Sequence, residues 1–257
     1  MKSSNIKFLL TTALAVVLSA TAPAAPAGQQ KTRTRTGTYQ DSKGNSGTIN
    51  SSTTRSPGSR SHTATWTNQN GQTGDHTSSS TWNKAADTGT FSSSTTLTNG
   101  KSASREGTVT ETANNTYQID GARTGFNGKT STFDLDKTKT ATGSTTTGTI
   151  TGTNGVSTLN STTTKTATGY DKDTTVTGPK GGTTTIDTTL TKSAGETVKN
   201  TAVTGPNGKT DDRVVDTKYN PDGSGTRTIE NTGPDGKTYT RTENFSAPTT
   251  TTSPPNG

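Results

Sequence analysis

The sequence predicts an all-β fold, a repetitive antiparallel meander of β-hairpins, with a β-solenoid as the alternative. Three observations lead to this prediction: threonine recurs at every second position, turn signals return at a nearly constant spacing, and large apolar residues are scarce. The 257 residues include 67 Thr, 26 Ser and 29 Gly, and only 27 large apolar residues follow Gly28. Since globular domains are about 45–50% apolar, this composition excludes an ordinary enzyme fold.

Turn signals divide the chain into about eight repeats of roughly 27 residues. Later copies contain Gly-Pro-Asn-Gly or Gly-Pro-Asp-Gly, in which Pro presets φ and the final Gly accepts a positive φ. The glycines of the main turns are Gly44, Gly71, Gly100, Gly128, Gly155, Gly181, Gly208 and Gly236. A second turn falls near each midpoint, at Pro57-Gly58, Asp87 to Gly89, Asn114-Asn115, Gly143, Gly169, Ala194-Gly195 and Pro221-Asp222-Gly223. Two strands per repeat give about 16 strands.

Between the turns, the residues alternate with the period of a β-strand. Over residues 145–153, Thr at each odd position alternates with Gly148, Ile150 and Gly152, and over residues 31–39 Thr alternates with basic residues and Tyr39. Large residues keep a fixed place in the repeat, which predicts apolar contacts stacked from copy to copy. They stand five positions before or after the main-turn glycine, at Tyr39, Trp66, Ile150, Val176 and Val203, and at Ile49, Phe133 and Ile186.

The two ends of the chain differ from the repeats. Lys2 and Lys7 precede a short apolar run and small residues, which predicts a signal peptide over residues 1–27 and a secreted, periplasmic or cell-surface location. The β-repeat region then covers residues 28–246, with residues 40–110 less ordered because they are Ser-rich. Residues 247–257 read as a disordered tail rich in Pro and Thr. No later segment is apolar enough for a membrane-spanning helix.

Charge and cysteine content limit the chemistry further. The net charge is +7 and there is no Cys, so the sequence offers neither disulfides nor thiolate metal sites. Basic and acidic residues are interspersed along the chain, and we interpret them as a solvated surface of mixed sign. A basic balance also suits polyanions such as cell-surface polysaccharide.

Part of the sequence resembles a known family of repeats. Tyr219-Asn220-Pro221-Asp222-Gly223, followed by Gly233-Pro234-Asp235-Gly236, resembles the YD repeats of Rhs-type bacterial surface and toxin-shell proteins, and Tyr170-Asp171 adds a partial match. The Thr-Gly-Pro-Asn-Gly pattern is also similar to uncharacterised secreted bacterial β-repeat proteins. These resemblances imply a secreted, β-rich surface protein.

Candidate chemistry is sparse, and the sequence predicts no catalytic, cofactor or metal site. His62 and His76 stand half a repeat apart with Asp75 beside one of them, which we interpret as surface histidines. The Asn220–Asn231 segment partly matches an EF-hand loop but lacks its final Glu. Carboxylates pair on a common face at Asp134/Asp136 and Asp171/Asp173. Aromatics are too few for base-stacking platforms, so no specific nucleic acid is expected.

The sequence therefore predicts a non-enzymatic structural protein of the cell surface or extracellular matrix, acting as a spacer, fibre subunit or adhesin stalk. Self-association through exposed strand edges would suit that role. Two alternatives remain: an ice-binding-like surface of Thr arrays, or a module that binds polysaccharide or another polyanion. For the last, Trp66, Trp82 and the Lys31/Arg33/Arg35 row could provide a surface.

Overall fold

The computed structural model describes residues 29–253. These residues form 17 β-strands connected by turns, and none of them is helical. The predicted signal peptide lies outside the described residues. The strands are β1 (Gln30–Asp41), β2 (Ser46–Ser56), β3 (Ser59–Asn68), β4 (Thr73–Asn83), β5 (Thr88–Thr96), β6 (Ser102–Ala113), β7 (Thr116–Thr124), β8 (Thr130–Thr140), β9 (Gly143–Gly152), β10 (Gly155–Lys165), β11 (Gly169–Thr177), β12 (Thr183–Ser193), β13 (Glu196–Thr204), β14 (Thr210–Tyr219), β15 (Gly225–Thr232), β16 (Thr238–Phe245) and β17 (Thr249–Ser253).

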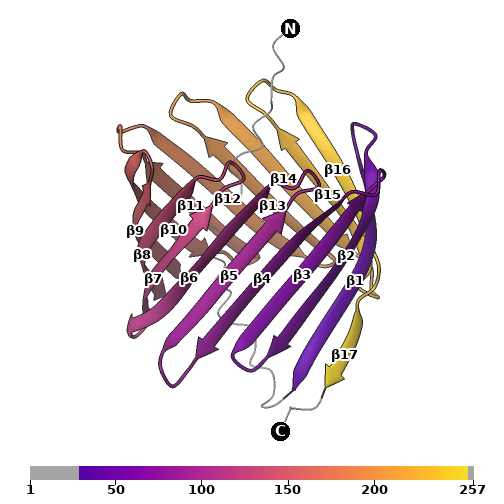
Figure 1. Ribbon diagram of the computed structural model, residues 1–257, viewed down its shortest axis with the longest axis horizontal. Coiled ribbons are helices and arrows are strands. Elements are labelled where there is room, and N and C mark those ends of the chain that lie inside the picture. The colour runs from indigo at the N-terminus through magenta and orange to yellow at the C-terminus, as the bar shows by residue number, and fades with distance from the viewer. Residues whose placement is uncertain (1–28, 254–257) are drawn as a thin grey trace.

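The strands form an antiparallel meander that closes into a barrel (Figure 1). Each strand from β1 to β15 pairs with the next along the chain, and β16 pairs back with β1 over Gly37–Asp41. The short strand β17 pairs with the other end of β1, residues Gln30–Thr34. The meander is therefore confirmed and the alternative solenoid is wrong. The physical reason is that each tight turn reverses the chain, so neighbouring strands cannot run parallel.

The predicted turns account for this reversal. At Gly205–Lys209, the Gly205 N–H donates to the Lys209 carbonyl at 2.9 Å and the Gly208 N–H donates to the Gly205 carbonyl at 2.9 Å. Gly208 has φ +73°, as a type I turn followed by a left-handed residue requires. The same two bonds recur around six further main-turn glycines, and Gly155 differs because β9 and β10 join through two residues. Turn chemistry thus sets both strand length and register.

Aromatic side chains cover glycines on the neighbouring strand. A Cβ built on Gly107 would lie 2.6 Å from the Phe91 ring, and one on Gly121 would clash with Phe133. Because Gly107 and Gly121 are themselves opposite each other, the two rings meet above them and stack with centroids 6.2 Å apart. An aromatic over a glycine compensates for the missing side chain. Other pairs of this kind are Tyr39 with Gly47, Trp66 with Gly74, Trp82 with Gly89, and Phe245 with Gly225.

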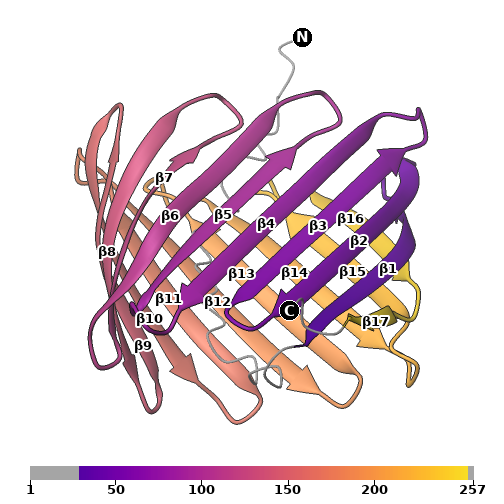
Figure 2. The same ribbon diagram turned by 60° about the horizontal axis from the view of Figure 1, so that its bottom comes forward.

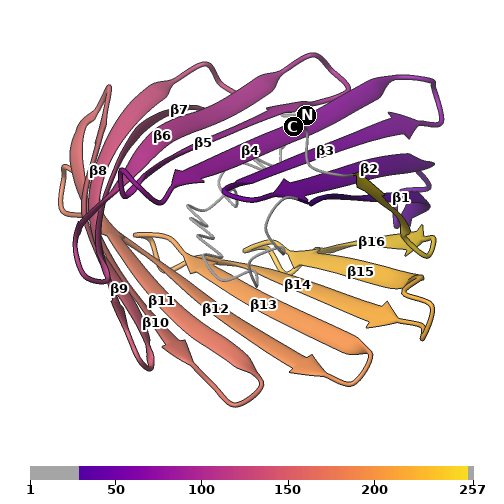
Figure 3. The same ribbon diagram turned by 90° about the horizontal axis from the view of Figure 1, so that it is seen from below.

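The strands form an elongated ring, with β8–β10 at one end and β1 and β16 at the other (Figures 2 and 3). The apolar core lies on β6–β10. The core cluster consists of Val109, Tyr117, Ile119, Phe133, Leu135, Ile150 and Leu159. Several of the large residues that stand five positions from a main-turn glycine are cross-strand partners. Ile49 faces Trp66, Phe133 faces Ile150 and Ile186 faces Val203.

Two regions predicted to have low order contain strands. Residues 40–110 hold β2–β5 and most of β6, and residues 247–257 hold β17. A lower degree of order in these regions remains a prediction.

The glycines under aromatic rings predict a stability effect. Gly107→Ala would place a Cβ against the Phe91 ring and the Asp120 carbonyl, and we expect it to lower the free energy of unfolding by about 1–3 kcal/mol. Gly152→Ala is the matched control on the same side of the wall, because its Cβ would meet only the Ser131 Cβ at 3.7 Å. Urea unfolding would measure both. Equal effects of the two substitutions would contradict the close packing of Gly107 against the Phe91 ring and the neighbouring strand.

Candidate functional site

The wall of the barrel has two faces of different chemistry. We define the inner face as the side that carries Ile119 and every residue that shares its side through the strand register. The eight buried hydrophobic residues and the four buried polar residues all lie on this face. Side chains converge on the concave side of a closed sheet and diverge on the convex side. The buried face is therefore the inside of the barrel, and the Thr-rich exposed face is the outside.

Charged residues divide between the two faces. The inner face carries sixteen Lys and Arg residues against four acids, Asp41, Glu111, Asp211 and Glu243. The outer face carries one strand lysine, Lys218, against twelve acids. The inner basic residues are Lys31, Arg33, Arg35, Arg55, Arg60, Arg105, Arg123, Lys137, Lys139, Lys165, Lys172, Lys192, Lys199, Arg213, Arg227 and Arg241. The outer acids are Asp75, Glu106, Asp120, Asp134, Asp136, Asp171, Asp173, Asp187, Glu196, Asp212, Asp216 and Glu230.

The inner cations form an electrostatically connected row. Burial lowers the pKa of Lys172, and the nearby Lys199 lowers it further. Burial likewise lowers the pKa of Lys199, with a further contribution from Arg213. Lys137 on β8 has its pKa lowered by burial and then by Lys139 and Lys172. The row therefore crosses from β8 to β14, and its side chains are half-buried.

At the seam where β1 meets β16, the inner acids Asp41 and Glu243 both have side-chain partners. Glu243 accepts from Arg241 at 3.0 Å and from Arg227 at 3.4 Å. Asp41 accepts a hydrogen bond of 2.7 Å from the Tyr239 hydroxyl. Burial raises the Asp41 pKa, but hydrogen bonds from Tyr239, Asn45 and Lys43 outweigh this and bring the pKa to about 2. Three of the four inner-face acids are thus on β1, β14 and β16, which leaves β7–β13 with inner cations alone.

The structure brings His62 and His76 together but assembles no triad. Their rings lie on the inner face with centroids 6.0 Å apart, and each Nδ1 is hydrogen-bonded to a threonine hydroxyl, Thr53 at 2.9 Å and Thr95 at 2.8 Å. Burial, then His76 and Arg60, lower the His62 pKa. Asp75 lies on the outer face, opposite Thr65, so it cannot orient either ring.

The other sequence candidates have structural explanations. Asp222 accepts bonds from the Ser224 amide at 2.9 Å and hydroxyl at 2.7 Å, which is turn chemistry in the segment that partly matches an EF-hand. The carboxylate pairs Asp134/Asp136 and Asp171/Asp173 lie on the outer face. Over residues 29–253, no group of three or more His, Cys, Asp or Glu residues could hold a metal ion.

The two tryptophans lie on the inner face and are occupied by packing. Trp66 covers Gly74, and Trp82 covers Gly89 and meets Tyr117 edge-on with centroids 6.2 Å apart. Of the Lys31/Arg33/Arg35 row, Arg35 lies 5.1 Å from the Phe245 ring centroid. These residues therefore share the inner face of the neighbouring strands β1, β3 and β4.

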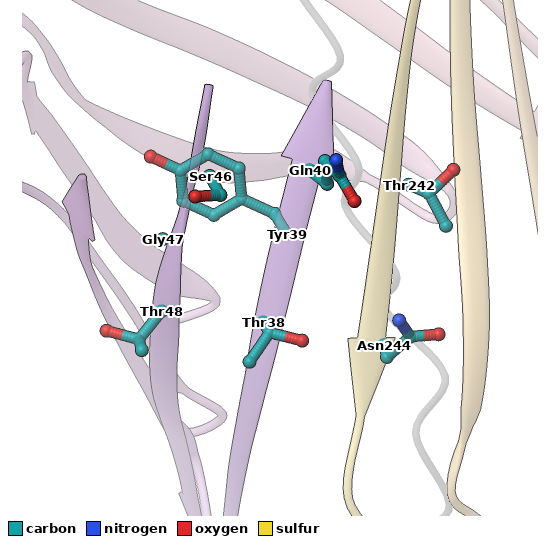
Figure 4. A pocket seen from close by; sticks show the side chains of 8 residues that line it. All are labelled: Thr38, Tyr39, Gln40, Ser46, Gly47, Thr48, Thr242 and Asn244. Atoms are coloured by element: carbon teal, nitrogen blue, oxygen red, sulfur yellow. The ribbon is translucent and has the colours of Figure 1, made fainter. Parts of the chain in front are cut away.

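A shallow depression of about 440 Å³ lies over the seam (Figure 4). Its outer-face side chains are uncharged, and they come from β1, β2 and β16. Its lining consists of Thr38, Tyr39, Gln40, Ser46, Gly47, Thr48, Thr242 and Asn244. The depression therefore presents hydroxyl and amide groups and no charged side chain.

Sequence reasoning missed the basic inner face because it treated the charges as interspersed. The sequence contains a usable signal. Within most strands, Lys and Arg occupy the same alternate positions as the large apolar residues, whereas Asp and Glu occupy the other set together with Thr. In β8, for example, Phe133, Leu135 and Lys137 alternate with Asp134 and Asp136. The correct interpretation is two surfaces of opposite sign in place of one mixed surface.

Within residues 29–253, no helix is long and apolar enough to cross a membrane. No protein-family model, curated protein or solved structure matches the chain.

The seam predicts an acid-sensitive contribution to stability. Because the folded-state pKa of Asp41 is about 2, below the ordinary value of 3.8, its contribution is full above about pH 4 and is lost as the pH falls toward 2. Tyr239→Phe removes one hydrogen bond to the carboxylate. We expect this variant to unfold with a weaker dependence on pH between 4 and 2, measured as melting temperature against pH. Tyr219→Phe, also on the inner face, is the control and should keep the wild-type slope. An unchanged slope in Tyr239→Phe would refute this assignment.

Proposed function

We propose that the protein is an exported, non-enzymatic module that binds an anionic polysaccharide along the inner face of its barrel. The observation that supports this most strongly is the separation of charge, with sixteen cations and four acids on the inner face against one lysine and twelve acids outside. A surface of one sign inside low-dielectric walls concentrates ions of opposite sign. Export, to the periplasm or beyond, is part of the proposal and rests on the N-terminal sequence.

A polymer fits this lining better than a small ion does. The cations are spread over strands from β1 to β16 instead of converging on one point. A barrel of 16 strands is also wider than its own side chains can fill, and the inner cations of the β8–β14 row are half-buried, so water reaches them. Repeated negative charge along a chain would engage several of these cations at once.

A structural role at the cell surface or in the matrix is the second candidate. The outer face, with its Thr hydroxyls and acids, is polar throughout most strands, as a spacer or shell requires. Each strand from β1 to β16 has a partner on both sides over at least part of its length, and among the described strands β17 is the one with a partner on one side alone. Self-association through strand edges is therefore proposed for β17. The outer Thr rows carry acids such as Asp134 and Asp173, which interrupt an ice-binding array.

We also propose that the barrel consists of about eight copies of one hairpin unit of roughly 27 residues. The left-handed glycines support this, because seven of the predicted main-turn glycines have φ between +72° and +80°.

The polyanion proposal predicts a charge-dependent affinity. Mature protein should bind dextran sulfate and not neutral dextran, with an affinity that falls as salt is added. The double variant Lys172→Glu/Lys199→Glu reverses two inner charges, and we expect it to weaken binding at least about tenfold by loss of charge-assisted contacts. Isothermal titration calorimetry at low ionic strength measures the dissociation constants.

The matched control reverses two lysines in turns, Lys180→Glu/Lys209→Glu, and changes the net charge by the same amount. Its affinity should remain within about twofold of wild type, since exposed charges away from the contact are screened. If both double variants lose affinity equally, binding follows net charge alone and the inner face is not the site.

A further inference from the structure

Two arginines on the inner face stand opposite each other without a counter-charge. Arg105 on β6 is the direct cross-strand partner of Arg123 on β7. Like charges directly opposite in a sheet destabilise it. No salt bridge within residues 29–253 includes either arginine. The one inner-face acid on these strands, Glu111, is six residues from Arg105, about 20 Å along the strand.

Each guanidinium is nevertheless held in place by a neighbour. The Arg105 Cζ lies 5.0 Å from the centroid of the Phe91 ring, which is itself stacked on Phe133. The Arg123 Nε donates a 2.9 Å hydrogen bond to the Ser131 hydroxyl. The Arg105 Nε is buried without a hydrogen-bond partner. Among the described residues, none accepts a hydrogen bond from the terminal guanidinium nitrogens of Arg105 or Arg123. Both guanidinium groups are therefore pre-positioned with free N–H donors for a ligand.

Serines complete the row on both sides. Ser93 on β5 is the cross-strand partner of Arg105, and Ser131 on β8 is the partner of Arg123. Four polar side chains therefore stand in line across β5, β6, β7 and β8. Beside them along the strands lies the row of Phe91, Gly107, Gly121 and Phe133.

Other inner arginines differ in their surroundings. Arg227 and Arg241 share the carboxylate of Glu243, and Arg213 donates to Asn231 at 3.1 Å. Arg55 and Arg60 also face each other, but both are exposed, next to the turn between β2 and β3. Arg105 and Arg123 thus combine partial burial, supporting contacts and the absence of a carboxylate.

We propose that Arg105 and Arg123, flanked by Ser93 and Ser131, form a subsite for a phosphate monoester group. Two guanidinium forks supply two positive charges and paired N–H donors, which suit a tetrahedral oxyanion. A phosphate monoester carries about −1.5 to −2 charges at pH 7, whereas a sulfate ester or a carboxylate carries one. This subsite rests on the proposed function, because it identifies a phosphorylated polysaccharide as the polymer class.

The test compares glucose 6-phosphate with glucose 6-sulfate, which share a sugar ring and differ in charge, by titration calorimetry on the mature protein at pH 7.5. Wild type should bind the phosphate more tightly. Arg105→Gln and Arg123→Gln should each weaken phosphate binding by about ten- to a hundredfold, the loss of charge-assisted hydrogen bonds. Arg105→Lys keeps the charge but not the fork, and should also weaken it.

The control is Lys180→Gln/Lys209→Gln, which removes two exposed turn lysines outside the inner face and should leave phosphate binding within about twofold, since exposed charges away from the contact are screened. Thermal unfolding shows whether a loss of phosphate binding comes from misfolding. Because each substitution relieves like-charge repulsion, we expect the melting temperatures of the Arg105 and Arg123 variants to be at least as high as that of wild type. Equal affinity for the two sugar esters, or equal losses in the control, would overturn the subsite.

The outcomes separate the two proposals. Dextran sulfate binding that persists without phosphate ester binding would overturn the subsite and leave the polysaccharide module standing. Failure to bind either probe would overturn both. Displacement of glucose 6-phosphate by single-stranded DNA but not by a phosphorylated polysaccharide would overturn the assignment of the polymer class.

Discussion

The pairing of β16 with β1 closes the sheet into a barrel, and this closure separates an inner face from an outer face. The pairing consists of five register pairs over Gly37–Asp41, extended along β1 by β17. Once the sheet is closed, period-two alternation sends every second side chain into the barrel, and a one-residue slip in any strand would exchange the two faces of that strand. Turn geometry fixes the register, and the acids near the seam pair there with Arg227, Arg241 and Tyr239.

The aromatic residues reconcile two demands of the inner face. The face must bury most of the few large apolar side chains, and it also carries many cations that repel one another. Rings laid over glycines fill space that the neighbouring strand leaves empty, and several of the same rings hold a cation against their face. Arg241 lies 4.0 Å from the Tyr39 centroid and Lys139 lies 4.2 Å from the Tyr117 centroid. A cation over an aromatic face gains about 0.5–1 kcal/mol or more as it is desolvated, which offsets part of the repulsion.

The sequence predicted the strands, their antiparallel order and the turns, because these depend on local chemistry such as the positive φ of Gly208 and the Thr alternation of residues 145–153. Closure could not be predicted in the same way, since it depends on contact between residues 37–41 and 241–245, which are far apart along the chain. The composition of the inner face could have been predicted from the sequence. In β8, Lys137 alternates in step with Leu135, and Asp136 alternates in step with Thr132. The Arg105–Arg123 pair additionally required the register of β6 against β7.

The most direct test of a basic interior and an acidic exterior uses the absence of native cysteine. Thr163 lies on the inner face opposite Lys172, and its neighbour Thr164 lies on the outer face opposite Asp171. Thr163→Cys and Thr164→Cys would each be reacted at low ionic strength with two thiol reagents, one carrying a sulfonate and one a trimethylammonium group. A basic interior predicts a higher ratio of anionic to cationic reaction rate at position 163 than at 164, and equal ratios after unfolding in urea. Equal ratios in the folded protein, or a higher one at 164, would contradict it.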